Sequence, residues 1–281
     1  MAPGYGAGVY SAVAPAFFEP MGEGRWAATS ATAGPWHPEL MHAGPPSALL
    51  ARALEHTDPR TGWLFSRLSV DVLGPLPVDV VEVSSRVLRD GRSVSLLEAE
   101  MTVRGRVALR ATAWRMRTED LPLPRDGDPG RGDDRHAPET ARRLPAEDFP
   151  GHVEGYVSAM ELRMVSGDVA RAGPAVAWMR QQVPLVPDEQ PSGLQRVMAV
   201  ADSGNGISGM LDQRAYSYVN TDLTVHLVRE PVGEWVFMDA VTVVDPSGVG
   251  LATTRLGDIR GPLGSGAQSL HVARRKASET L

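Results

Sequence analysis

The sequence predicts an α+β fold in which one unit, a helix lying across an antiparallel sheet, occurs twice. Three observations lead to this prediction. Each half carries an apolar helix followed by several strands, the two halves match at a nearly constant spacing, and a stretch rich in Pro, Gly and charge lies between them. The 281 residues are 42% hydrophobic and 22% charged, an ordinary globular composition that is sufficient for two small cores.

The helix of the first half is predicted over residues 46–57. Pro45 and Pro46 precede the run SALLARALEHT, and proline is tolerated in the first turn of a helix. Leu50 and Leu54 recur at the spacing of one helical face.

Four strand-like segments follow between residues 64 and 118. They are rich in β-branched residues, partly alternate between apolar and polar, and are separated by turn residues. Asp90-Gly91 and Arg104-Gly105 are typical of hairpins. One helix followed by a run of antiparallel strands favours a helix packed on one face of a sheet.

Residues 119–151 are predicted to be a linker, because they are rich in Pro, Gly and charge and have little to bury. The linker divides the chain into an N-terminal unit, residues 15–118, and a C-terminal unit, residues 152–275. In the second unit, LQRVMAVADSGNGIS is predicted to be a helix that runs into a glycine-rich exit, and further strands follow it.

The repeat is visible in the letters. The segment LSVDVLGPL begins at Leu68, and LTVHLVREP begins 155 residues later at Leu223. Gly105 and Gly261 begin matching late segments with a spacing of 156. A constant spacing indicates duplication. Two unrelated β-rich stretches with similar propensities remain the alternative.

Composition excludes several classes of function. The formal net charge is -6, which argues against a nucleic-acid partner. The sequence contains no run of 18 apolar residues, so no membrane span is predicted. With no cysteine, the chain has no disulfide, thiolate nucleophile or Cys-ligated metal, and a cytoplasmic location is expected. The histidines lack metal-binding spacing, so neither a metal nor a cofactor is predicted.

The order of motifs resembles the acyl-CoA thioesterase II family in its double-hotdog form. The first unit carries MHAGPPSALLARALE, SVDVLGPLPV and VEVSSRVLRDGRSVSLLEAEM, and the second carries NTDLTVHLVREPVGEW and GVGLATTRLGDIRGPLGSGAQSLHV. The resemblance covers about residues 15–275. It implies two antiparallel sheets, each wrapped around a central helix. It also implies hydrolysis of an acyl-CoA or acyl-carrier thioester, and a homo-oligomer is expected.

The resemblance carries three catalytic candidates. Asp202, near the end of the second unit's helix, matches the family's Asp, and Gln268 on the last strand matches its Gln. The family's hydroxyl residue aligns with Asn220, a departure, and Thr221 stands next to it as a substrate-binding candidate. An amide can still hold a water by hydrogen bonds.

These residue types suit thioester hydrolysis. A carboxylate such as Asp202 serves as a general base or as a nucleophile, while neutral amides orient a water. The start of the first helix, His42-Ala43-Gly44, is predicted to bind the substrate and to supply main-chain N–H groups to the oxyanion. No GxSxG motif offers a serine nucleophile.

Structural roles for the same residues stay open on local sequence. Asp202 before Ser-Gly-Asn-Gly is also typical of a helix end. Asn220 and Thr221 are compatible with ordinary strand positions, and Gln268 with a solvent-facing one. His42 before a helix is compatible with capping or packing.

Two other functions are compatible with the sequence. Hydratases and dehydratases of the same fold need a paired Asp and His, and no stretch of either half shows such a pair. A non-hydrolytic acyl-thioester-binding or biosynthetic tailoring protein is the third possibility, because of the departure at Asn220.

Overall fold

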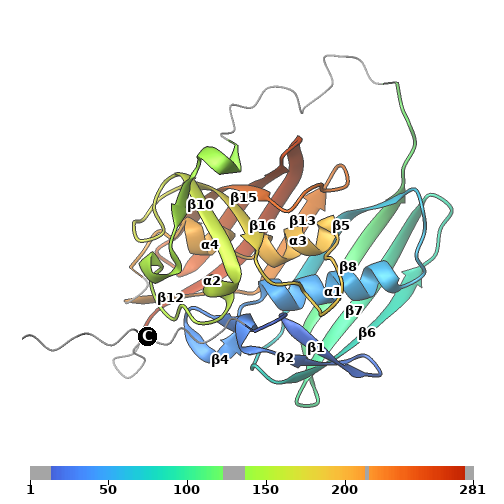
Figure 1. The fold of residues 1–281 in the computed structure, drawn as a ribbon, viewed down its shortest axis with the longest axis horizontal. Helices are drawn as coiled ribbons and strands as arrows, with labels where there is room; N and C mark the ends of the chain where they lie inside the picture. Colours follow the sequence, from blue (N-terminus) through green and yellow to red (C-terminus); the bar gives the residue numbers. More distant parts are fainter. Residues whose placement is uncertain (1–13, 123–136, 213–214, 276–281) are drawn as a thin grey trace, which may run out of the picture.

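The computed structural model describes residues 14–122, 137–212 and 215–275 (Figure 1). In this part of the chain, 14 strands form one sheet, and two short strands form a separate pair. The expectation of two separate sheets is thereby corrected. Strand β5 (Trp63–Val72) of the first half pairs with β13 (Asp222–Leu227) of the second, because two edge strands satisfy each other's free N–H and C=O groups.

The first half contains one α-helix, eight strands and a single 3-10 turn among the described residues. The elements other than β5 are β1 (Phe18–Gly22), β2 (Arg25–Ala28), η1 (Ser30–Thr32), β3 (Ala33–Gly34), β4 (His37–Met41), α1 (Gly44–His56), β6 (Val80–Arg89), β7 (Val94–Val103) and β8 (Arg106–Arg117).

The second half adds the remaining helices and strands. They are η3 (Pro138–Thr140), β9 (Arg142–Leu144), η4 (Ala146–Asp148), α2 (Tyr156–Ala159), β10 (Met160–Ser166), β11 (Ala175–Gln181), α3 (Gly193–Ala201), α4 (Gly204–Ile207), β12 (Tyr216–Asn220), β14 (Val236–Val244), β15 (Val249–Asp258) and β16 (Gly261–Arg274). β9 lies within the predicted linker and pairs with β10 at the edge of the sheet, whereas residues 123–136 of that linker lie outside the described residues.

Strand order is the same in the two halves. The order β1-β2-β6-β7-β8-β5 is repeated as β10-β11-β14-β15-β16-β13. At the junction, Ser69 pairs with Thr224, which lies 155 residues later, and their hydroxyl oxygens are 3.0 Å apart. Because each of these residues pairs with its own counterpart, a pseudo-twofold axis passes between them.

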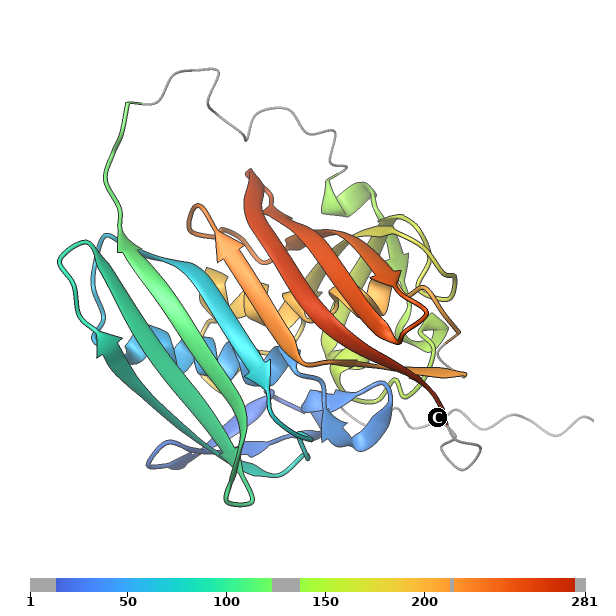
Figure 2. The same ribbon diagram turned by 180° about the vertical axis from the view of Figure 1, so that it is seen from behind.

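Two helices lie on one face of the sheet (Figure 1), which is seen from its other side in Figure 2. Helix α1 begins two residues before the predicted start and packs on β6, β7 and β8 through buried Leu50 and Leu54. Helix α3 begins after Ser192, whose hydroxyl accepts the N–H of Gln195. α1 and α3 also pack on each other, so the two halves share a core.

The predicted helix of the second half is interrupted at one point. α3 ends at Ala201, and α4 begins at Gly204, so Asp202 and Ser203 lie in the break. This break places Asp202 where the end of α3 meets the start of α1. Among the described residues, no helix is long and apolar enough to cross a membrane.

Candidate active site

The carboxylate of Asp202 is buried and held by two amide side chains. Asp202 is only 3% exposed. Asn220 donates from Nδ2 to Asp202 Oδ1 at 2.9 Å, and Gln268 donates from Nε2 to the same oxygen at 3.1 Å. The two amides therefore fix the position of the carboxylate.

The strands fix both amides. Asn220 is the last residue of β12 and Gln268 lies within β16, the strand with which β12 pairs. Gln268 Oε1 accepts the backbone N–H of Asn205 at 3.1 Å, and its Nε2 donates also to the main-chain oxygen of Asp202. These contacts leave one orientation of the Gln268 amide, with its nitrogen toward the carboxylate.

His42 of the first half completes the cluster. Its Nδ1 lies 3.2 Å from Asp202 Oδ2 and also accepts the N–H of Gly44 at 3.1 Å. Burial lowers the pKa of His42, and the charge of Asp202 only partly opposes this, so the imidazole is neutral near neutral pH. The contact thus brings a titratable group from each half of the chain to one point.

Two aromatic rings hold the imidazole in place. Tyr156 stacks on His42 with ring centroids 3.7 Å apart and an interplanar angle of 4°, and Trp36 stacks at 5.5 Å. The Tyr156 hydroxyl donates to the main-chain oxygen of Ala199 at 2.7 Å and lies 2.8 Å from Ser203 Oγ. Burial raises the pKa of Tyr156, so its hydroxyl stays protonated.

Sequence reasoning did not find these two aromatic residues. Trp36 follows a proline and Tyr156 follows a glycine, and neither neighbour marks a site by itself. Gly155 has a φ of 141°, a conformation that side-chain-bearing residues rarely adopt, and it turns the chain so that Tyr156 reaches His42.

Gly44 allows the close approach of the two helices. A Cβ atom at this position would lie 2.3 Å from the main-chain oxygen of Ala199 on α3. The absence of a side chain thus brings the start of α1 against the end of α3. This contact places His42 within reach of Asp202.

Most main-chain donors at the start of α1 are already engaged. The N–H of His42 donates to Thr32 O at 2.8 Å, that of Gly44 donates to the His42 ring, and that of Ser47 donates to Ala43 O at 3.0 Å. Ala43 N–H makes no hydrogen bond with another described residue. Of the predicted segment His42-Ala43-Gly44, it is the donor that remains available to a substrate.

Thr221 does not join the cluster. Its side chain is exposed, and its hydroxyl lies 3.4 Å from Asp222 Oδ1 and 3.5 Å from Ser269 O. Successive side chains of extended chain point to opposite sides, so Thr221 turns away where Asn220 turns inward. The structure thus brings together Asp202, Asn220, Gln268 and His42.

Comparisons with known proteins identify the family of the chain. Two family models match, the acyl-CoA thioesterase N-terminal domain over residues 32–116 and the acyl-CoA thioesterase C-terminal domain over residues 134–272. The chain belongs to the acyl-CoA thioesterase family. The residues matched by the first model include His42, and those matched by the second include Asp202, Asn220 and Gln268. No curated protein matches the sequence at a significant level.

Solved structures that resemble this thioesterase-family chain have the hotdog fold. A conserved protein of unknown function with a hot dog fold from Alicyclobacillus acidocaldarius is 15% identical, with a TM-score of 0.70 over 90% of this chain and 92% of that one. The acyl-CoA thioesterase II TesB2 from Mycobacterium marinum is 16% identical, with a TM-score of 0.58 over 93% and 95%. The dehydratase domain from the CurK module of curacin polyketide synthase is 14% identical, with a TM-score of 0.50 over 94% and 99%. The hotdog prediction is confirmed.

Two further features of the described residues define what the site offers. No group of three or more His, Cys, Asp or Glu side chains is arranged to hold a metal ion among them. A cavity of about 510 Å³ lies away from Asp202, and its walls include Glu55, Phe65 and Leu194.

Proposed function

We propose that the protein hydrolyses an acyl-CoA thioester to a free acid and CoA, with Asp202 as the general base. Membership of the acyl-CoA thioesterase family supports thioester hydrolysis. The observation that carries the role of Asp202 is the convergence of the Asn220 and Gln268 amides on one oxygen of a buried carboxylate. Both donors hold the carboxylate in one position, as a general base requires.

The attacking water is held by Asp202 and Asn220. The Nδ2 atom of Asn220 is directed at the carboxylate, and its Oδ1 is available to accept a hydrogen bond from the same water. Asp202 takes a proton from this water while the water oxygen bonds to the thioester carbonyl carbon. The tetrahedral intermediate then collapses, the C–S bond breaks, and the CoA sulfur leaves and takes up a proton.

The negative oxygen of the intermediate needs donors that exist before the reaction. Ala43 N–H is free at the start of α1, where the helix dipole also favours negative charge. Pro45 and Pro46 have no N–H, so this helix start offers fewer donors than an ordinary one. The N–H of Ala43 is therefore the main-chain donor that stabilises the negative oxygen of the intermediate.

A thiol-release assay tests the proposal. A thiol-reactive chromophore reports CoA directly, because the chain has no cysteine that would react with it. We expect release from at least one of short, medium and long saturated acyl-CoA substrates, and Asp202→Asn is expected to reduce the rate at this centre by about 10²–10⁴-fold. Glu23→Gln, in the exposed turn after β1, is the acid-to-amide control and is expected to keep the wild-type rate.

Two results would contradict the proposal. Tight binding of acyl-CoA without thiol release at any chain length would favour the non-hydrolytic acyl-binding protein. Full turnover by Asp202→Asn would remove Asp202 from the mechanism. The same assay with acyl-carrier thioesters separates the two substrate classes, while the expected homo-oligomer and cytoplasmic location stay predictions.

A second candidate function, hydration or dehydration of an acyl thioester, is favoured by one contact. His42 and Asp202 come from different halves and lie 3.2 Å apart, a pairing that no local stretch of sequence reveals. Among the similar solved structures are two inactive mutants of the CurK dehydratase, one with His replaced by Phe and the other with Asp replaced by Asn. Crotonyl-CoA distinguishes the two functions, because loss of the conjugated double bond without thiol release would establish hydration.

A further inference from the structure

The cavity of about 510 Å³ occupies the opposite end of the α1–α3 pair from Asp202. Its lining includes Glu55 near the end of α1, Leu194 in the first turn of α3 and Leu227 at the end of β13. The two helices run antiparallel, since Gly44 meets Ala199 at one end and Glu55 meets Ser192 at the other. Each end therefore joins the start of one helix to the end of the other.

The pseudo-twofold axis relates the cavity to the Asp202 cluster. Phe65 lines the cavity and pairs with Arg115, whereas Asn220, 155 residues after Phe65, pairs with Leu270, 155 residues after Arg115. The register is therefore the same in both halves at this point. The cavity therefore occupies the position in the first half that corresponds to the position of Asp202 in the second half.

A carboxylate is present at this second position too. Ser192 donates from Oγ to Glu55 Oε1 at 2.7 Å, and Gln195 donates from Nε2 to Glu55 Oε2 at 2.6 Å. An amide and a hydroxyl hold Glu55, as two amides hold Asp202. The donors now come from the start of α3, because Phe65 and Ala113 stand at the positions related to Asn220 and Gln268 by the spacing of 155.

Gln195, which holds Glu55, also carries a buried acceptor without a partner. Gln195 is 3% exposed, and its Oε1 has no hydrogen-bond partner among the described residues. It belongs to the same amide whose nitrogen contacts Glu55, so one water can donate to Gln195 Oε1 and to the carboxylate. A buried acceptor without a partner calls for an explanation, and a bound water or a catalytic role is among those available.

The start of α3 also offers free main-chain donors. Gly193 and Leu194 occupy the first turn of a nine-residue helix, and their N–H groups make no hydrogen bond with another described residue. Neither is a proline, in contrast to the start of α1. Leu194 lines the cavity, so its N–H is the main-chain donor placed to meet a carbonyl oxygen there.

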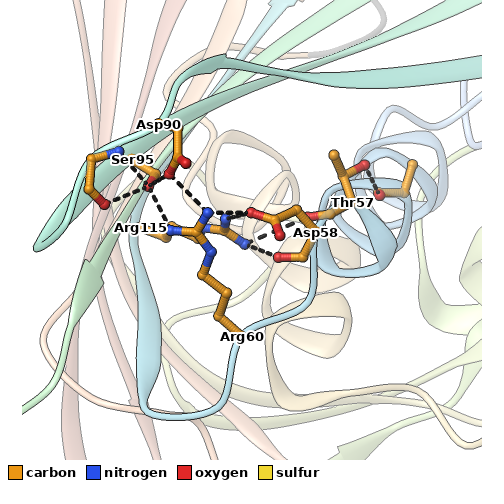
Figure 3. A network of polar contacts seen from close by, with 8 residues as sticks. Thr57, Asp58, Arg60, Asp90, Ser95 and Arg115 are labelled. Carbon is orange, nitrogen blue, oxygen red and sulfur yellow. Dashed lines mark hydrogen bonds and ion pairs between the residues drawn. The ribbon is translucent and has the colours of Figure 1, made fainter.

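The wall near the end of α1 is held by ion pairs. Figure 3 shows Arg60 and Arg115 converging on Asp58, directly after the helix, while Arg60 also binds Asp90. Arg115 is 2% exposed and lines the cavity. These ion pairs hold the loop after α1 against β8 and against the turn between β6 and β7.

We propose that this cavity is a second thioester site, in which Glu55 is the general base that deprotonates the attacking water. The water oxygen bonds to the carbonyl carbon, the N–H group of Leu194 receives the negative oxygen, and the C–S bond breaks as the thiol takes up the proton. The inference takes its substrate class from the proposed function. Burial raises the pKa of Glu55, with Glu189 acting in the same direction and Ser192, Gln195 and His56 opposing, and a higher pKa makes a stronger base.

Four full-length proteins test the inference: wild type, Asp202→Asn, Glu55→Gln and the double variant. Thiol release from the best acyl-CoA substrate is measured for each. We expect Asp202→Asn to retain a residual rate, and Glu55→Gln to lower that residual rate by a further ~10²-fold or more. The residual rate is also expected to fall on acidification as Glu55, whose pKa is raised, takes up a proton beside Glu230 of the same cavity. A purely structural role for Glu55 would not cause this fall.

Glu55→Gln keeps the size of the side chain, and Ser192 Oγ can accept from the new amide, so the fold is expected to survive; thermal unfolding checks this. If Asp202→Asn is already as slow as the double variant, the second site is refuted and the proposed function stands. If Asp202→Asn keeps the full rate and Glu55→Gln abolishes it, the cavity is supported and the role of Asp202 is refuted. A wild-type chain that releases no thiol from any substrate refutes both.

Discussion

The two ends of the α1–α3 pair differ in where the donors to the carboxylate come from. At the Asp202 end, they come from strands β12 and β16, through Asn220 and Gln268. At the Glu55 end, they come from the start of α3, through Ser192 and Gln195. One duplicated scaffold thus provides two carboxylate environments, and the local sequence of each half decides which elements supply the hydrogen bonds.

The two ends also differ in access. Around Asp202, the side chains of His42 and Gln268 are nearly fully buried, and Tyr156 covers the imidazole. Around Glu55, the walls enclose a cavity of about 510 Å³. The Asp202 end is thus the more closed of the two, although Trp36, which stacks on His42, is 42% exposed.

Removal of the strand-borne amides has the largest expected effect that distinguishes the two ends. Asn220→Ala and Gln268→Ala each remove a hydrogen bond to a carboxylate, worth about 1.5–3 kcal/mol, so the hydrolysis rate is expected to fall by roughly 10–150-fold. Ser192→Ala is the matched change at the other end and is expected to leave turnover by Asp202 unaltered. Rates per folded molecule, with unfolding followed in parallel, measure the difference. Equal losses for all three variants would mean that the two ends do not act separately.

Closure of the Asp202 end depends on Gly44, which leads to the next largest effect. A methyl group added in Gly44→Ala would meet the main-chain oxygen of Ala199 at 2.3 Å, and backbone cannot move aside as a flexible side chain can. We expect a loss of about 1–3 kcal/mol in the free energy of unfolding, measured by denaturant titration. Gly206→Ala is the control, because no atom lies within 4 Å of its added Cβ. Similar stability of the two variants would show that α1 and α3 separate at little cost.

Much of the fold was predictable because it depends on local pattern. The helix predicted over 46–57 is found at Gly44–His56, and the spacing of 155 read from the letters is the spacing of the Ser69–Thr224 pair. The single continuous sheet was not predictable. It follows from the choice of β5 and β13 as the strands that join, and hydrophobic periodicity does not identify the partner of an edge strand.

The site was predictable in part, for a related reason. Asp202, Asn220 and Gln268 were chosen by resemblance, and they do converge. The contact of His42 with Asp202 spans the two halves of the chain, so no local motif reveals it. Engagement of the Gly44 N–H by the His42 ring depends on the turn before α1, and such loop geometry is not encoded in a simple residue pattern.

The smallest expected effect is a difference in the sign of the pH dependence of stability. The pKa of His42 is lowered from 6.5, so just below pH 6.5 the unfolded chain binds a proton there that the folded chain does not. The free energy of unfolding then falls on acidification. The pKa of Glu55 is raised from 4.5, so above pH 4.5 the folded chain retains a proton that the unfolded chain has released, and stability falls as the pH rises through this window.

Two variants separate these contributions. His42→Gln is expected to flatten the loss of stability below pH 6.5, and Glu55→Gln to flatten the loss above pH 4.5 and to raise stability near neutral pH relative to wild type. Denaturant titrations at intervals between about pH 4.5 and 8 measure both. A steeper loss of stability below pH 6.5 in His42→Gln would instead mean that the imidazole is charged in the folded chain and paired with Asp202. That outcome would weaken the distinction between the two ends, because each would then contain a carboxylate with a strong hydrogen-bond donor from the other half.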